Sequence, residues 1–170
     1  MNNADPESQS LIAQLLLLVV LTFINAFLAA AEIAVVSVNK NRVEQKAEDG
    51  DAKAQKLLKV LQDPNNFLST IQVGITLVNI LSGASLAETL SSRLAPVLGG
   101  GAAAKSLASI IILALLTYVS IVFGELYPKR IAMNKSEEVA QLTSGAVRFL
   151  GVIARPFVWL LSASTDLLSK

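Results

Sequence analysis

Three long apolar stretches constrain the fold of this chain more than any other feature of its sequence. They cover most of residues 11–38, 66–98 and 107–123, and the charged residues are gathered in blocks between them. A helix of about 20 apolar residues crosses a bilayer core of about 30 Å. Only 16% of the 170 residues are charged and the mean hydropathy is +0.57, whereas soluble domains carry about 25% charged residues. The sequence therefore predicts an all-α integral membrane protein with about three transmembrane helices.

The pattern divides the chain, as a single transmembrane domain over residues 1–170, into five segments. We expect a first transmembrane helix over about 10–38, two amphipathic juxtamembrane helices over 39–63, a second membrane region over 66–98, a third transmembrane helix over 106–133 and cytoplasmic or interfacial helices over 136–170. Gly83 leaves two possibilities for the second region: one long broken helix, or a helix followed by a re-entrant piece. We also expect a loop over 99–105 with Ser106 capping the third helix, and a separate piece starting at Pro156.

The positively charged residues predict the orientation in the membrane. Six of the fourteen Lys and Arg residues lie between Lys40 and Lys59, and three more follow the last long apolar stretch. Cytoplasmic loops are enriched in Lys and Arg. We therefore expect a cell-membrane protein with its N-terminus outside and its C-terminus in the cytoplasm.

Missing residue types exclude several function classes. The chain has no cysteine and no histidine, which removes thiolate and histidine metal sites, Ser/His dyads and the usual proton shuttle. Every aspartate lies outside the apolar stretches, so an intramembrane aspartyl protease is excluded. A net charge of +1 gives no indication of nucleic-acid binding. We therefore do not expect an enzyme.

Polar residues inside the first two apolar stretches are candidates for a binding site, because polar groups are costly at bilayer depth. In the first stretch, Asn25, Ala29 and Glu32 share one helix face, with small residues around them. In the second, the shared face carries Gln72, Thr76, Asn79 and Gly83. Amide and hydroxyl oxygens suit Mg²⁺ or Na⁺. The alternatives are a helix-packing seam in the first stretch and interhelical hydrogen bonds in the second.

The end of the third stretch is the most informative segment. Pro128 has no N–H, so it cannot donate to the carbonyl of Gly124 four residues earlier, and we expect a kink there. A freed carbonyl beside the carboxylate of Glu125 is a plausible half-site for a hard cation. The alternative is a plain proline kink in which Glu125 pairs with Lys129, one turn away.

The residues occur as three motifs in a fixed order: Asn25-Ala-Phe-Leu-Ala-Ala-Ala-Glu32, then Gln72-Val-Gly74-Ile-Thr76, then Gly124-Glu125-Leu-Tyr-Pro128-Lys129. This combination resembles the transmembrane domain of the CorC/CNNM family of magnesium transporters. The resemblance implies a homodimer in the lipid bilayer, with cytoplasmic CBS domains that these 170 residues do not contain and that we expect in a longer chain. It also implies Mg²⁺ binding at positions matching Asn79, Glu125 and Gly124, and coupling to Na⁺. The chain departs from the family pattern at Ala29 and Ala31, where many members carry serine.

Together these features predict a secondary transporter that moves Mg²⁺, in the outward direction and coupled to Na⁺. Asn79, Glu125, Gly124, Thr76 and a backbone carbonyl near Ala29 are the expected ligands. The expected supporting or gating residues are Asn25, Glu32, Gln72, Pro128 and Lys129. The alternative is a dimeric membrane scaffold that transports nothing and holds a structural or regulatory cation.

Overall fold

The described chain is almost entirely helical. The computed structural model describes the backbone of residues 6–168, and the side chains of 11–82, 86–153, 156, 159, 160 and 164. No strand occurs within residues 6–168, which confirms the predicted all-α fold. The elements in chain order are α1 (Pro6–Ser37), α2 (Lys40–Glu48), α3 (Ala52–Gln62), α4 (Pro64–Leu94), α5 (Gly101–Ile121), the π-helical turn η1 (Val122–Leu126), α6 (Tyr127–Asn134) and α7 (Ser136–Leu168).

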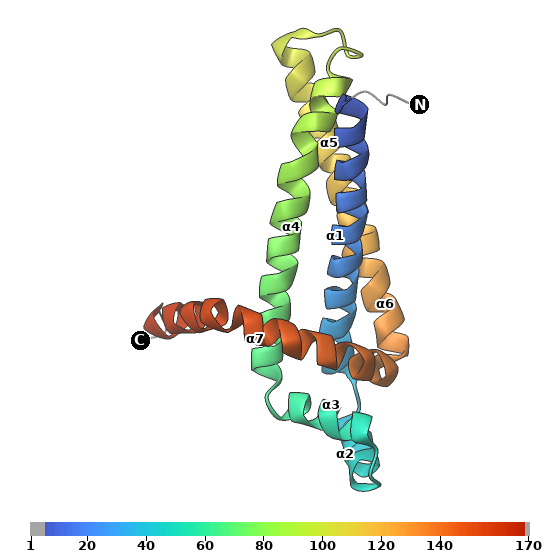
Figure 1. The fold of residues 1–170 in the computed structure, drawn as a ribbon, viewed down its shortest axis with the longest axis vertical. Coiled ribbons are helices and arrows are strands. Elements are labelled where there is room, and N and C mark those ends of the chain that lie inside the picture. Colours follow the sequence, from blue (N-terminus) through green and yellow to red (C-terminus); the bar gives the residue numbers. More distant parts are fainter. Residues whose placement is uncertain (1–5, 169–170) are drawn as a thin grey trace.

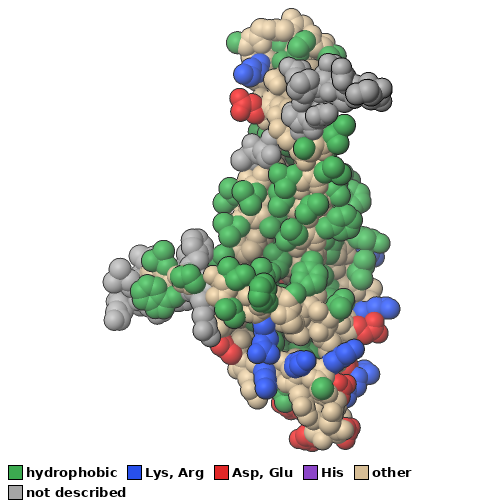
Figure 2. Space-filling model, in the orientation of Figure 1, with side chains coloured by type: hydrophobic (Ala, Val, Ile, Leu, Met, Phe, Trp, Pro, Cys, Tyr) green, Lys and Arg blue, Asp and Glu red, His purple; other side chains and the backbone are tan. Residues whose placement is uncertain are grey.

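Three long helical stretches form a bundle, in which α4 runs antiparallel to α1 and to the continuous run α5–η1–α6 (Figure 1). Within the described residues, the stretches Leu11–Ser37, Pro64–Leu94 and Gly101–Asn134 are long and apolar enough to cross a membrane. Large apolar side chains cover the outside of the bundle (Figure 2). A helix satisfies its own backbone hydrogen bonds, so it is suited to a surrounding of lipid. The prediction of about three transmembrane helices is confirmed.

The second membrane region is one uninterrupted helix. α4 continues through Gly83 to Leu94, so the re-entrant alternative is wrong. A glycine inside a helix costs only about 1 kcal/mol relative to alanine. Breaking the helix at membrane depth would cost more, because backbone groups would lose their partners.

The third helix begins earlier than predicted. α5 starts at Gly101, the last of three consecutive glycines at positive φ (Gly99, Gly100 and Gly101). That left-handed backbone suits glycine and reverses the chain between α4 and α5. Ser106 is therefore inside the helix, where its hydroxyl donates to the carbonyl of Ala102 at 3.1 Å. The expected capping role of Ser106 is wrong.

α7 lies across the end of the bundle where α1 ends and α4 begins (Figure 1). It is a single helix with Pro156 inside it, whereas the sequence predicted a separate piece starting at that proline. A proline removes one backbone hydrogen bond and can be accommodated when the remaining bonds of a long helix persist. The acidic residues Glu137 and Glu138 occupy the first turn of α7, where they complement the helix dipole.

The two predicted amphipathic helices are present as α2 and α3, below the bundle (Figure 1). Asn39 caps α2 by accepting a hydrogen bond from the backbone N–H of Arg42 at 3.2 Å. Asp51 caps α3 by accepting from Lys53 at 2.8 Å and from Ala54 at 3.3 Å. These backbone N–H donors hold the pKa of the Asp51 carboxyl below its usual value.

One hydrophobic core joins the ends of the helices at this side of the molecule. Small side chains allow the backbones to approach closely, and Ala29, Ala31 and Ala34 of α1 are fully buried in this core. Leu28 and Val35 of α1 are also buried in it, and the members from α2, α3, α4, α6 and α7 are Val43, Ala47, Ala54, Leu57, Val60, Phe67, Ile71, Ile75, Ala132, Ala140 and Val147. The core fixes the membrane helices to the juxtamembrane helices and so positions the polar residues between them.

Candidate cation site between the three membrane helices

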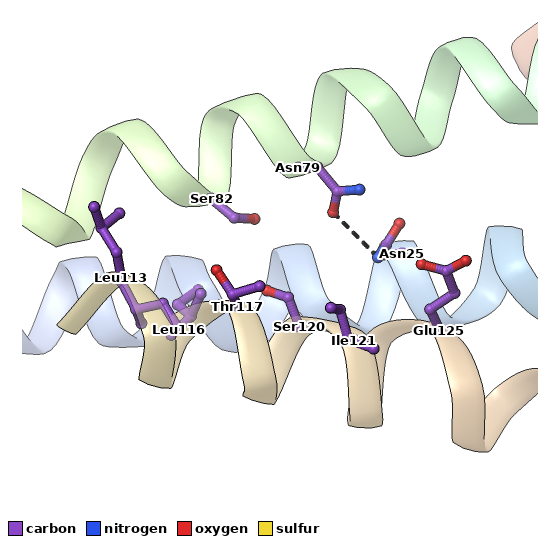
Figure 3. Close-up of a pocket in the computed structure, with 10 residues that line it drawn as sticks. Asn25, Asn79, Ser82, Leu113, Leu116, Thr117, Ser120, Ile121 and Glu125 are labelled. Atoms are coloured by element: carbon purple, nitrogen blue, oxygen red, sulfur yellow. Dashed lines mark hydrogen bonds between the residues drawn. The ribbon is translucent and has the colours of Figure 1, made fainter. Parts of the chain in front are cut away.

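A polar cavity of about 200 Å³ lies between α1, α4 and the run α5–η1. Asn25 comes from the middle of α1 and Asn79 from the middle of α4, while Glu125 comes from η1. The polar ends of these three side chains face one another (Figure 3). The full lining consists of Leu18, Asn25, Asn79, Ser82, Leu113, Leu116, Thr117, Ser120, Ile121 and Glu125.

Asn25 forms the floor of this cavity. Its side chain is only 3% exposed, and its Nδ2 donates to Oδ1 of Asn79 at 3.3 Å. Its own Oδ1 is buried and accepts no hydrogen bond. Buried polar atoms in folded proteins nearly always have a partner, and an exception points to an unfilled role. The Asn25 amide oxygen is therefore available to a cation.

Gly124 allows η1 to approach Asn25 closely. A Cβ atom at position 124 would lie 3.0 Å from Nδ2 of Asn25 and 3.6 Å from its Cβ. A side chain there would make the Asn25 amide shift by a few tenths of an ångström. The glycine thus permits close packing against Asn25, in addition to any role of its carbonyl.

The turn that carries Glu125 is wider than an α-helical turn. The N–H of Tyr127 donates to the carbonyl of Val122, five residues earlier, and Pro128 follows in the first turn of α6. The proline at 128 cannot donate to Gly124, so the regular pattern is interrupted at that point. Single π-helical turns of this kind occur frequently at functional sites. The sequence predicts an interrupted helix at this point, as a proline kink, whereas the structure has a π-helical turn.

Glu125 also takes part in an ionic triad at the edge of the cavity. The ammonium of Lys129 lies 2.9 Å from a carboxylate oxygen of Glu125 and 3.0 Å from one of Glu32. All three side chains are roughly one third exposed, at 27%, 37% and 30% respectively. The pairing of Glu125 with Lys129 that the sequence left open is therefore present, and Glu32 of α1 joins it. Lys129 occupies the position that a cation between these carboxylates would take.

Of the ten predicted site residues, three line the cavity (Asn25, Asn79 and Glu125), and four others lie away from it. Ala29 is in the hydrophobic core, and Gln72 and Thr76 are exposed on α4. The hydroxyl of Thr76 donates to the carbonyl of Gln72 at 2.8 Å, within the helix. Pro128 lies beside a separate apolar groove of about 570 Å³ between α1 and α6. The structure thus brings together Asn25, Asn79 and Glu125, places Gly124 against Asn25, and holds Glu32 and Lys129 at the edge.

Sequence reasoning missed three hydroxyl groups in the lining, on Ser82, Thr117 and Ser120. Helical spacing could have found them. Ser82 follows Asn79 by three residues, and Thr117, Ser120 and Gly124 are spaced by three and four on one face. They were overlooked because isolated hydroxyl residues are common in membrane helices and usually bond to their own backbone.

The cavity offers hard oxygen ligands and a single carboxylate. Within the described residues, no three His, Cys, Asp or Glu side chains are grouped so that they could hold a metal ion. Amide, hydroxyl and carboxylate oxygens are the ligands that hard cations prefer. A site of this composition favours a cation that keeps part of its hydration shell, or one that is bound for a short time during passage.

Comparisons with known proteins show the family of the chain. Residues 16–170 match the family model of the Cyclin M transmembrane N-terminal domain (CNNM). A UPF0053 protein of Synechocystis is 40% identical over 165 residues, covering 94% of this chain and 36% of that relative. The UPF0053 inner membrane protein YfjD of Escherichia coli is 33% identical over 147 residues, covering 86% of this chain and 32% of its own length.

A third relative has a functional name. The polyamine export protein of Haemophilus influenzae is 32% identical over 148 residues, covering 85% of this chain and 34% of that protein. The chain thus spans about a third of the length of these curated relatives. Because the family model covers nearly the whole sequence, this chain is a membrane protein that belongs to the CNNM transmembrane domain family.

Proposed function

We propose that this domain is the membrane part of a secondary transporter that moves Mg²⁺ through the cavity between α1, α4 and η1. The main support is the convergence of Asn25, Asn79 and Glu125 near the middle of three membrane helices. The buried Oδ1 of Asn25 adds a ligand that accepts no hydrogen bond from the described residues. Substrate sites of secondary transporters typically lie near the bilayer midplane, at breaks in regular helix.

We further propose that Mg²⁺ moves outward in exchange for Na⁺, as the family resemblance implies. The same resemblance, with the Lys and Arg residues around α2, α3 and α6, supports a cytoplasmic location for α7 and an external one for the N-terminus. The helices would rock about the cavity, so that it opens to each side in turn.

The direct test is a flux assay on the purified chain in liposomes that contain a Mg²⁺ indicator. We expect saturable Mg²⁺ flux that follows an imposed Na⁺ gradient and changes direction when the gradient is reversed. Asn79→Ala should reduce the flux by about tenfold or more, because it removes one cavity oxygen and the partner of Asn25. Ser106→Ala is the matched control, since that hydroxyl bonds only within its own exposed helix. Full flux in Asn79→Ala would contradict the proposed site, and no flux in a folded wild type would favour the scaffold.

An organic ammonium ion is a second candidate substrate. Lys129 places a primary ammonium between two carboxylates at the cavity edge, and the walls include Leu18, Leu113 and Leu116, which suit a methylene chain. The Haemophilus influenzae relative is named a polyamine export protein. Repeating the assay with radiolabelled putrescine distinguishes the two candidate substrates. Putrescine flux without Mg²⁺ flux would show that the cargo is an organic amine and not Mg²⁺.

We propose that the domain works as a homodimer. Gln72 and Thr76 present a polar stripe on the exposed side of α4. Polar side chains facing lipid are costly, and a second copy would cover them. Light scattering on the detergent-solubilised chain should give a protein mass of about twice 18.0 kDa. A mass equal to one chain in mild detergent would contradict the dimer.

A further inference from the structure

A second cleft, separate from the cation cavity, lies between α3 and α7. It has a volume of about 500 Å³ and is at the end of the bundle where α7 crosses it. Lys53 and Lys56 of α3 and Arg148 of α7 contribute its basic side chains. The remaining lining consists of Glu138, Gln141, Leu142, Ser144 and Gly145. A Cβ added at Gly145 would meet no atom within 4 Å, so the cleft is open at its centre.

The basic side chains of this cleft lack counter-ions. Lys53, Lys56 and Arg148 form no ion pair with any described residue. The acidic residue of the lining, Glu138, is turned to Lys135 at 3.7 Å. Figure 2 shows Lys and Arg side chains gathered along the boundary below α7. The cleft thus holds an excess of positive charge that complements an anion.

The basic residues of α2, by contrast, are paired with carboxylates. Arg42 lies 3.2 Å from a carboxylate oxygen of Glu137, Lys46 contacts the other oxygen, and Lys40 lies 3.8 Å from Glu44. Lys59 of α3 and Arg148 of α7 both line a neighbouring cavity of about 230 Å³, which also includes Asp63. Among the described residues of α2 and α3, unpaired positive charge is therefore found on α3, the helix that lines the cleft with α7.

The surroundings of the cleft are apolar on the side of the bundle. α7 lies across the bundle end (Figure 1), and large apolar side chains along this helix are exposed: Leu142, Phe149, Val152, Ile153, Trp159 and Leu160. A helix with one apolar and one basic side lies in the plane of a membrane interface. A ligand of the cleft would meet cations at one end and apolar side chains at the other.

We propose that the α3–α7 cleft binds the phosphate of an anionic phospholipid. Lys53, Lys56 and Arg148 contact the headgroup, and the acyl chains run along the exposed apolar side chains Leu142 and Phe149. Clusters of Lys and Arg close to a membrane helix attract anionic lipids. The bound lipid would tie α3 to α7, and α3 leads directly into α4, which carries Asn79.

The test is the affinity of the purified chain for phosphatidylglycerol, measured by native mass spectrometry in detergent with phosphatidylcholine as the neutral lipid. We expect the wild type to prefer phosphatidylglycerol. The triple variant Lys53→Gln, Lys56→Gln and Arg148→Gln should lose about tenfold or more in affinity. The triple variant Lys40→Gln, Lys105→Gln and Arg130→Gln removes the same charge elsewhere and should keep the affinity.

Two further measurements distinguish a specific lipid site from misfolding of the variant and from a site for soluble anions. The triple variant Lys53→Arg, Lys56→Arg and Arg148→Lys changes the same positions but retains their charges, and it should bind the lipid as the wild type does. Its binding would show that the loss in the glutamine variant comes from the missing charges and not from misfolding. Inorganic phosphate should fail to displace the lipid at millimolar concentration. Equal losses in both glutamine triples would overturn the specific site. Displacement by inorganic phosphate would also overturn the proposal, because the cleft would then be a soluble-anion site.

Discussion

Replacing Glu125 with glutamine is expected to weaken Mg²⁺ binding by about thirtyfold. Truncating one charged partner of a buried pair costs about 2–5 kcal/mol, and Glu125, whose side chain is 37% exposed, falls at the lower end of that range. Glu125 is the only carboxylate that lines the cavity, within the described residues. The amides of Asn25 and Asn79 remain in Glu125→Gln, but they are neutral and cannot balance the positive charge of the cation. Calorimetric titration of the detergent-solubilised protein measures the effect.

The fold should survive this substitution. Lys129 keeps its contact with Glu32 at 3.0 Å, and glutamine has the size of glutamate. Glu138→Gln is the matched control, because Glu138 is 77% exposed and pairs only with Lys135. If the protein is a transporter, the Glu125→Gln variant loses Mg²⁺ flux but still elutes as the wild type does. Unchanged Mg²⁺ binding and flux would show that the cargo does not pass Glu125. A variant that no longer folds or assembles would favour the scaffold alternative.

The second large effect concerns Lys129. In Lys129→Met, the carboxylates of Glu32 and Glu125 lose the ammonium that lies between them. Removing one partner of a fully buried ion pair costs about 3–5 kcal/mol. These side chains are about one third exposed, so we expect the free energy of unfolding to fall by about 2 kcal/mol in the absence of divalent cations.

Addition of Mg²⁺ should reverse this loss. The ion can take the place of the ammonium between the two carboxylates, and a ligand at 100 times its dissociation constant stabilises the folded state by about 2.7 kcal/mol. Wild-type protein should gain less from Mg²⁺, because Lys129 competes for Glu125. Thermal unfolding with EDTA and with Mg²⁺ measures both effects. Lys135→Met is the control, since Lys135 pairs with Glu138 at the surface. If Mg²⁺ stabilises the Lys129→Met variant no more than it stabilises the wild type, Lys129 does not compete with Mg²⁺ for Glu125.

These two predictions rest on one feature of the structure. Lys129 occupies a cation position next to a cavity that is lined with oxygen ligands. Transport of a cation past Glu125 would then require the ammonium to shift toward Glu32, which stays within reach at 3.0 Å. Glu32 and Lys129 are among the residues that the sequence predicts as supporting or gating, and a gating role would act through access to Glu125.

Much of the fold follows from local patterns. The length of the apolar stretches predicted three membrane helices, and the spacing of Val43, Ala47, Leu57 and Leu58 predicted the amphipathic helices α2 and α3. Gly83 and Pro156 were misleading, because both residues lie inside continuous helices. A glycine inside a helix costs about 1 kcal/mol and a proline about 3 kcal/mol relative to alanine, and the contacts of a long helix with its surroundings can outweigh such local preferences.

The candidate site was only partly predictable. Helical spacing placed Gln72, Thr76 and Asn79 on one face of α4, yet only Asn79 lines the cavity. A helix face spans a wide arc, and the rotation of α4 against α1 decides which residues of that arc face inward. That rotation depends on packing such as that of Gly74, where an added Cβ would lie 2.8 Å from Leu28.

The sequence by itself determined the class of the protein: its membrane helices, its basic juxtamembrane belt, and the three motifs that identify its family. These properties depend on composition and periodicity, which act over a few turns of helix. The tertiary structure alone decided that Asn25 meets Asn79, that Glu32 and Glu125 share Lys129, and that Lys53 faces Arg148 across a cleft. Such contacts join residues far apart in the chain, and they are fixed by how close small side chains let the helices pack and how each helix is rotated.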